Sequence, residues 1–162
     1  MDESNLRTVY EANLSMAKFL SKTLEEQEDG KLLVKYSASP EQRHNGEYYH
    51  TKGCAFDQQM IWECFTDTVK YADALGIKDP FIEQLRADVK RLDPVQVGLS
   101  GQIKEYREEQ YYGDIGEYHH RHISHLVGLY PGTVMNGNTP EWLKAASYSL
   151  NERGDVSTGW ST

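Results

Sequence analysis

Apolar side chains recur at steps of three and four residues along much of the chain, and this pattern constrains its fold more than any other feature. The spacing predicts four helices, each with one apolar face, over residues 4–27, 56–75, 79–92 and 139–153. Asp79-Pro80 and Thr139-Pro140 each place a capping residue before proline, as at many helix starts. A short apolar helix over 122–129 and a small hairpin over 94–106 are also expected. Such helices bury their apolar faces against one another, so the sequence predicts a mainly α fold of helix pairs.

The size and charge of the chain exclude several classes of protein. Its 162 residues are 38% hydrophobic, enough for one core, and we expect a single domain over 1–162 with no second domain. The net charge of −8, without a basic cluster, predicts no nucleic-acid partner. No apolar run approaches the roughly 20 residues of a membrane span, so no membrane partner is expected. The first residues lack the apolar core of a signal peptide, and the sequence leaves the cellular location open.

Two long polar loops, 37–53 and 107–121, hold most of the tyrosine and histidine residues. Loops of this length are uncommon in a compact domain and are usually functional where they occur. Tyrosine faces can stack on sugar C–H surfaces, but they can equally belong to ordinary amphipathic packing. We therefore look for a site in these two loops.

The first candidate is Glu41, in the segment Ser37-Ala38-Ser39-Pro40-Glu41. Pro40 fixes its own φ angle and favours an extended Ser39, so this segment can present Glu41 rigidly. With Tyr48, Tyr49 and Trp62 nearby, such a carboxylic acid could have a raised pKa and donate a proton. The alternative is an ordinary turn with a solvated glutamate.

Glu105 is the second candidate carboxylate, in the segment Gly101-Gln102-Ile103-Lys104-Glu105-Tyr106. On a strand it shares a face with Ile103, while Lys104 lies opposite. It could serve as a second active-site carboxylate or bind a sugar hydroxyl. The alternative is an exposed charge on a hairpin.

Four histidines and an arginine fall within His119-His120-Arg121-His122-Ile123-Ser124-His125. His122 and His125 are three residues apart and could share a helical face, so a zinc site has to be considered. The cluster lacks an HExxH motif, and Cys54 and Cys64 are spaced for neither a disulfide nor a zinc knuckle. A group of donors that binds a polar ligand fits better, so we expect no metal and no cofactor.

Taken in order, these motifs resemble those of glycoside hydrolase family 95, which contains inverting α-1,2-L-fucosidases. The shared pieces begin with Ser37–Glu41, Asp57 at the start of a helix, and Gly101–Tyr106. They continue with His120–Leu126, Gly128–Gly132, Arg153-Gly154-Asp155 and Thr158-Gly159-Trp160-Ser161. The block HRHISHL followed by GLYPG is the most specific, and the resemblance runs from about residue 6 onward.

The resemblance implies a fold and a set of roles. The catalytic domain of the family is an (α/α)6 toroid more than twice as long as this chain, so we expect a partial toroid. Glu41 matches the general acid of the family, and Arg121 and His122 match residues that contact the fucosyl unit. Glu105 and Asp57 are expected to support or orient the substrate, although Tyr106 stands where the family has tryptophan. The family's water-activating Asn and Asp motifs do not occur in these 162 residues.

The leading hypothesis is a portion of an inverting α-1,2-L-fucosidase that acts on a fucosylated oligosaccharide or glycan. Glu41 would protonate the glycosidic oxygen, which requires apolar surroundings to keep it protonated near neutral pH. The alternatives are a non-catalytic helical domain that binds glycans or is purely structural, and a zinc hydrolase built on 119–125. A partial toroid also leaves helix faces uncovered, so we expect either an exposed apolar surface larger than is usual for monomers or a self-association that hides it.

Overall fold

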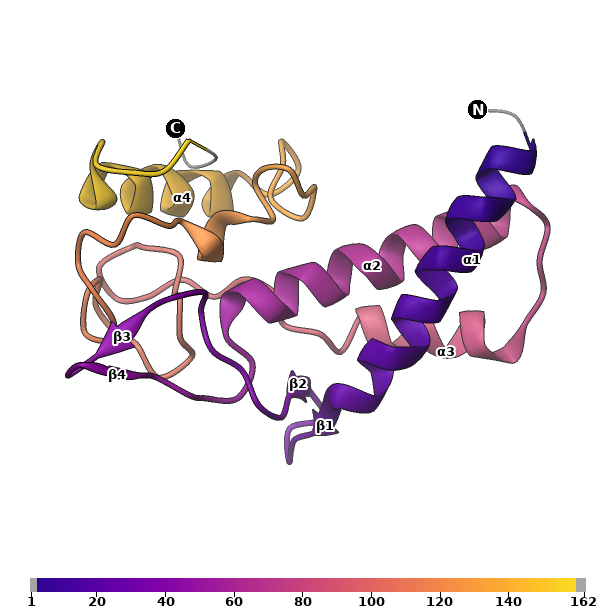
Figure 1. Ribbon diagram of the computed structural model, residues 1–162, viewed down its shortest axis with the longest axis horizontal. Helices are drawn as coiled ribbons and strands as arrows, with labels where there is room; N and C mark the ends of the chain where they lie inside the picture. Colours follow the sequence, from indigo (N-terminus) through magenta and orange to yellow (C-terminus); the bar gives the residue numbers. More distant parts are fainter. Residues whose placement is uncertain (1–2, 160–162) are drawn as a thin grey trace.

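The computed structural model describes residues 3–159, and four helices provide most of its regular structure (Figure 1). The helices are α1 (Glu3–Leu20), α2 (Ala55–Ala74), α3 (Pro80–Val89) and α4 (Pro140–Arg153). Two antiparallel pairs of very short strands accompany them, β1 (Leu24–Glu26) with β2 (Leu32–Val34) and β3 (Arg43–His44) with β4 (Glu47–Tyr48). The mainly α architecture of a partial (α/α)6 toroid is therefore confirmed. Trp160 and Ser161 of the last motif lie outside the described residues.

Helix α2 is the common support of the molecule. Helices α1 and α3 pack against it at one end (Figure 1), around a core in which Phe65 and Leu85 are fully buried. A second core lies towards α4 and contains Val95, Ile103, Leu126, Val134, Met135, Ala145 and Ala146. Trp62 of α2 contacts both cores. One helix therefore fixes the C-terminal half of the chain relative to the N-terminal half.

Two fully buried glutamines at the start of α2 join this helix to strand β2 and to the loop that carries the histidine cluster. The Gln58 amide accepts a bond from Val34 N and donates to Leu32 O, both at 3.0 Å. The Gln59 amide accepts from Gly128 N at 2.8 Å and donates to His125 O at 2.9 Å. Buried polar groups have to be paired, and these two amides pair backbone groups of the strands and loops around them. The loop that carries the histidine cluster is thus attached directly to α2.

Three of the expected helices are shorter in the structure, and the one expected over 79–92 ends at Val89. The predicted helix over 4–27 ends at Leu20, and the chain continues through a 3-10 turn, η1 (Ser21–Thr23), into β1. Positive φ at Gly30 allows the tight return to β2, so Leu24 is held by a strand pair and not by another helical turn. The predicted helix over 122–129 is reduced to a 3-10 turn, η2 (Ser124–Leu126), because Gly128 N binds the Gln59 side chain instead of an intrahelical carbonyl.

The other local predictions agree with the structure only in part. Asp79 caps α3 through its side chain, which accepts from Phe81 N at 2.8 Å. Thr139 precedes Pro140 at the start of α4, but its hydroxyl accepts a bond from Asn136 N and does not cap the helix. The hairpin over 94–106 is present only as one antiparallel bridge between Val97 and Ile103.

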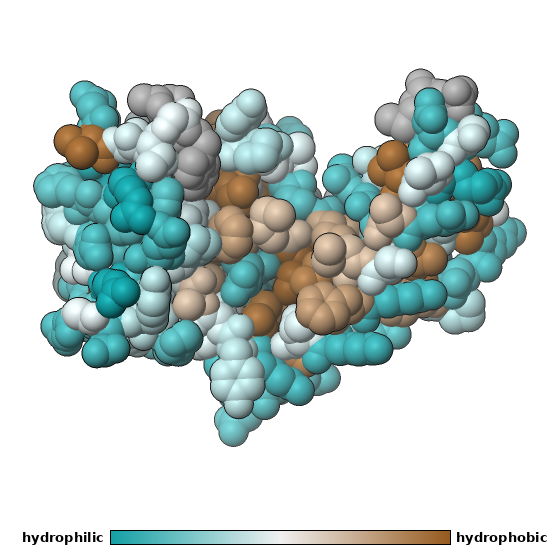
Figure 2. Space-filling model, viewed as in Figure 1, coloured by the Kyte–Doolittle hydropathy of each residue, from teal (hydrophilic) through white to brown (hydrophobic). Residues whose placement is uncertain are grey.

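An apolar band is visible on the face drawn in Figure 2, between the end that carries α4 and the end that carries α1. Exposed apolar side chains include Met16, Phe19 and Met60. Self-association through such a surface stays a prediction. None of the helices within residues 3–159 has the length and apolar character to span a membrane.

Candidate active site

The structure brings Glu41 together with Arg121 and His122, although eighty residues separate them in the sequence. Arg121 forms an ion pair with the Glu41 carboxylate. The same carboxylate oxygen lies 3.2 Å from His122 Nε2. The two long polar loops therefore meet at one carboxylate, which is the convergence that the sequence predicts.

The expected protonation state of Glu41 is wrong for this arrangement. About half of the Glu41 side chain is exposed. The aromatic residues expected near it have other contacts: Tyr49 packs edge-on against Tyr106, and Trp62 packs against both cores. The hydrogen bond from His122 and the charge of Arg121 lower the pKa of Glu41 below its ordinary value. Glu41 is consequently a carboxylate near neutral pH in this arrangement, because the contacts with His122 and Arg121 outweigh the small effect of burial.

Glu41 itself occupies an unusual backbone conformation. Its φ angle of 62° lies in the left-handed region, and Gln42 N donates to Ser39 O at 3.1 Å. A turn with proline second and a left-handed residue third normally takes glycine or asparagine at the third position. A glutamate there costs on the order of 1 kcal/mol or more, so the surrounding contacts have to hold it.

An open cavity of about 430 Å³ lies beside this carboxylate. Glu41, His122 and Ser124 form its polar side, and its apolar side is made by Pro40, Phe56, Met60, Val127 and Pro131. This volume falls in the range of about 300–1,000 Å³ that is usual for small-molecule sites. A cavity with an apolar wall and a few converging polar groups suits a ligand that has both hydroxyl groups and an apolar face.

Glu105, expected as a hairpin charge or a substrate contact, is buried with only 5% of its surface exposed. Its carboxylate accepts bonds from Ser39 Oγ, from Gln42 Nε2 at 3.0 Å and from Arg153 Nη2 at 3.1 Å. Burial alone would raise the pKa of Glu105, but the charge of Arg153 and the hydrogen bonds from Ser39 and Arg153 outweigh it and lower the pKa. Burial lowers the pKa of His125 to about 4, so His125 is neutral at pH 7 and Arg153 supplies the balancing charge.

Asp57 lies in the first turn of α2, and its carboxylate binds the start of the loop 37–53. It accepts from Ser37 Oγ at 2.7 Å, and Ser37 Oγ in turn accepts from Cys54 N at 2.9 Å. Burial raises the pKa of Asp57. These contacts attach the start of the loop 37–53 to α2, and a direct contact of Asp57 with substrate stays a prediction.

The histidines of the cluster face different partners. His119 Nδ1 lies 3.2 Å from Arg153 O, His120 Nδ1 accepts from His122 N, and His125 is buried beside Glu105. The expected shared helical face of His122 and His125 is wrong, because η2 begins only at Ser124. Over residues 3–159, no three His, Cys, Asp or Glu side chains are grouped as metal ligands would be. Cys54 and Cys64 are both free thiols, as their spacing predicts.

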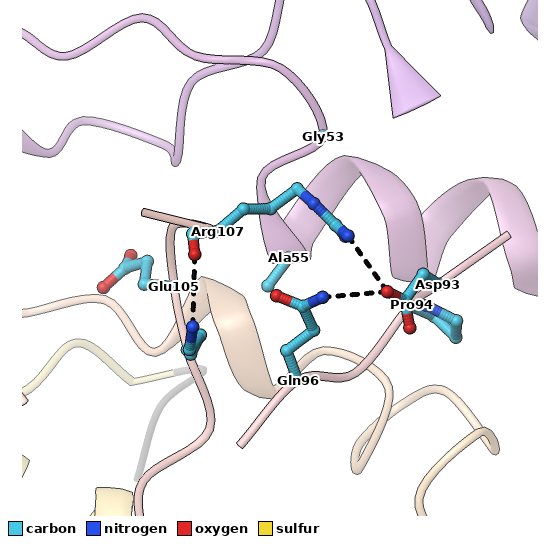
Figure 3. A pocket seen from close by; sticks show the side chains of 8 residues that line it. Gly53, Ala55, Asp93, Pro94, Gln96, Glu105 and Arg107 are labelled. Atoms are coloured by element: carbon cyan, nitrogen blue, oxygen red, sulfur yellow. Dashed lines mark hydrogen bonds and ion pairs between the residues drawn. The ribbon is translucent and has the colours of Figure 1, made fainter. Parts of the chain in front are cut away.

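The hollow next to Gly53 and Ala55 has a volume of only about 10 Å³ (Figure 3). Asp93 accepts bonds there from Arg107 Nη2 at 3.0 Å and from Gln96 Nε2 at 2.8 Å. The Glu105 carboxylate points away from Asp93 and its two donors, as Figure 3 shows. Space for roughly one water molecule makes this hollow a packing feature and not a ligand site.

Ser39, Gln42 and Arg153 all contact Glu105, and no local sequence pattern predicts these contacts. Arg153 was visible only as part of the motif Arg153-Gly154-Asp155, at the end of α4. Its guanidinium also donates to His120 O at 3.1 Å and to His122 O. The signal that could have identified it is an arginine on the predicted buried side of α4, because buried charges require a partner.

Glu109 makes stability depend on pH. It is buried and accepts from Glu105 N and Gln102 Nε2, both at 3.0 Å, and burial raises its pKa to about 7. The pKa of Glu109 in the folded protein lies above its value of about 4.3 in the unfolded chain. Ionisation of Glu109 therefore lowers the free energy of unfolding as pH rises from about 4 to 7. Glutamine does not ionise, so we expect the free energy of unfolding of Glu109→Gln to fall less over this pH range, by on the order of 2 kcal/mol. Urea unfolding of both proteins at pH 4.5 and pH 8 measures the difference, and parallel profiles would contradict the assignment.

Comparison with known proteins agrees with this picture. The model of the family described as "Glycosyl hydrolase family 95 catalytic domain" matches residues 1–162. The chain is 35% identical over 150 residues to "Alpha-L-fucosidase 2" of Arabidopsis thaliana, and the aligned region covers 89% of this chain and 17% of that protein. It is 34% identical over 142 residues to "Probable alpha-fucosidase A" of Aspergillus niger, covering 82% of this chain and 17% of that protein.

These relatives are much longer than the chain, which spans about a sixth of the length of each. The match covers the whole chain and includes both loops that meet at Glu41. With its mainly helical architecture and this family match over its full length, the chain belongs to glycosyl hydrolase family 95.

Proposed function

We propose that this chain supplies the acid and part of the sugar-binding surface of an α-L-fucosidase-like glycoside hydrolase. The observation that carries the proposal is the convergence of Glu41, Arg121 and His122 beside a cavity with an apolar wall. The names of the relatives, an alpha-L-fucosidase and a probable alpha-fucosidase, point to a terminal fucosyl group on an oligosaccharide or glycan. Fucose has hydroxyl groups for the polar side of the cavity and a methyl group for its apolar side.

Glu41 is the proposed general acid, and the pairing seen here is its resting state. When fucosyl hydroxyls bind Arg121 and His122, these groups no longer hold the Glu41 carboxylate. The bound sugar also excludes water, and both changes raise the pKa of Glu41. Protonated Glu41 then donates its proton to the glycosidic oxygen as the bond to the sugar C1 atom breaks.

An inverting mechanism needs a second group that activates water on the other face of the sugar. The two groups lie about 6.5–9.5 Å apart in inverting enzymes, which leaves room for that water. By resemblance to the family, the second group comes from Asn and Asp motifs that these 162 residues do not contain. We therefore propose that the chain alone binds sugar without turning it over, and that Asp57 contributes to the polar side of the site.

Titration of the chain with L-fucose tests this proposal by NMR. We expect L-fucose to shift the ring signals of His122 and to raise the pKa of Glu41, because the sugar replaces their mutual contact. D-glucose is the control ligand and should leave both unchanged. The absence of any response to L-fucose would reject the sugar site and favour the alternative of a purely structural helical part.

Activity is tested in a chimera in which this chain replaces the segment of Alpha-L-fucosidase 2 that it matches. Release of fucose from a 2′-fucosylated oligosaccharide supports the catalytic proposal. Sugar binding by the chain combined with a folded but inactive chimera would favour a non-catalytic glycan-binding domain.

A further inference from the structure

The buried pair Glu105–Arg153 contacts both loops that form the candidate site. On one side, the Glu105 carboxylate accepts from Ser39 Oγ and from Gln42 Nε2. Ser39 and Gln42 are the residues immediately before and after the Pro40-Glu41 dipeptide. The carboxylate therefore holds both ends of the turn that presents Glu41.

Arg153 binds the second loop in a corresponding way. Its Nη1 atom donates to the carbonyls of His120 and His122, the two residues that flank Arg121. Its Nη2 atom donates to Glu105 Oε2 at 3.1 Å. Its Nε atom donates to Tyr112 Oη at 2.8 Å. The planar guanidinium thus joins four acceptors in fixed directions, which a lysine ammonium group could not do in the same way.

We propose that the Glu105–Arg153 pair positions Glu41 against Arg121 and His122, and that both residues act through these groups without touching the sugar. The catalytic consequence rests on the proposed function, whereas the positioning itself does not. This assignment replaces the substrate-orienting role that family resemblance implied for Glu105.

Burial explains why this pair can fix geometry. Arg153 has only 3% of its surface exposed and Glu105 5%, so water cannot replace the bonds that either makes. An unpaired charge in such surroundings is costly, which keeps each partner in one orientation. Surface pairs such as Arg86–Asp73 lack this property because solvent competes for both groups.

The backbone of Glu41 shows that its turn needs such support. A non-glycine residue at φ 62° persists only where neighbouring contacts hold it. Two bonds to one buried carboxylate supply that support from both ends of the turn. Gln42 adds a third link, since its Oε1 atom accepts from Glu117 N at 2.8 Å in the second loop.

The test measures the pKa of Glu41 by NMR in the chain labelled with ¹³C-glutamate. Ser39→Ala removes one bond and leaves the buried pair intact, and Glu105→Asp keeps the charge but shortens the reach. We expect each variant to raise the pKa of Glu41 by about half a unit, because a less restrained turn no longer holds the Glu41 carboxylate as closely against Arg121. Asp93→Asn is the control, since it breaks the pair with Arg107 at the start of the second loop and leaves the Glu105–Arg153 pair intact.

A rise with Ser39→Ala and Glu105→Asp but not with Asp93→Asn supports the proposal. An unchanged pKa of Glu41 in both test variants overturns it, as does an equal rise in all three proteins, which would indicate general loosening. Amide spectra of α1 to α3 verify that each variant is folded. The measurement needs no sugar and no turnover, so its outcome is independent of whether the proposed function is correct.

Discussion

Glu105→Gln is expected to lower the free energy of unfolding by about 3–5 kcal/mol. The substitution removes the negative charge that balances Arg153, which remains buried with 3% of its surface exposed. The amide also presents one oxygen and one NH2 group where Ser39, Gln42 and Arg153 all donate, so one donor loses its acceptor. Urea unfolding of both proteins at pH 7 measures the loss from the midpoint and the slope.

Asp73→Asn is the matched control for this prediction. It breaks the ion pair with Arg86, whose partners are 2.8 Å apart but both substantially exposed. Exposed pairs contribute about 0–1 kcal/mol, so this variant should remain close to the wild-type protein. Equal losses in Glu105→Gln and Asp73→Asn would mean that the buried pair has no special role in holding the two loops.

Glu41→Gln is expected to reduce kcat/KM of the chimera by about 10²- to 10⁴-fold on a natural fucosylated oligosaccharide. Glutamine preserves the size of the side chain and can still accept a bond from Arg121, but it has no proton to donate. Glu47→Gln removes the same charge from the exposed end of the hairpin β3–β4 and serves as the control. Retention of full activity by Glu41→Gln would exclude Glu41 as the acid.

The pH dependence follows from the lowered pKa of Glu41 in the free protein. A general acid is active only while protonated, so kcat/KM should fall as pH rises through this low pKa. The profile of kcat reports the substrate complex, in which the proposal places the pKa of Glu41 higher. We therefore expect the decline of kcat at a higher pH than the decline of kcat/KM.

The helices could be predicted because their signals are local. Apolar spacing identifies α2 and α4, and Asp79-Pro80 places the start of α3 correctly. The ends of the first helix and of the turn η2 could not be predicted in this way. They depend on the return at Gly30 and on the Gln59 side chain, which reaches Gly128 across the fold.

The helical architecture and the two loops that hold Glu41, Arg121 and His122 can be predicted from residue type and spacing alone. Helix faces and turns depend on near neighbours in the chain, so local patterns carry this information. Which carboxylate is buried and which is exposed depends on contacts between distant parts of the chain. Glu105 is buried because Ser39, Gln42 and Arg153, distant in sequence, surround it, and Glu41 is ionised because His122 and Arg121 lie beside it. Burial and charge pairing are set by long-range contacts, so the protonation states of this site follow from the fold and not from any local motif.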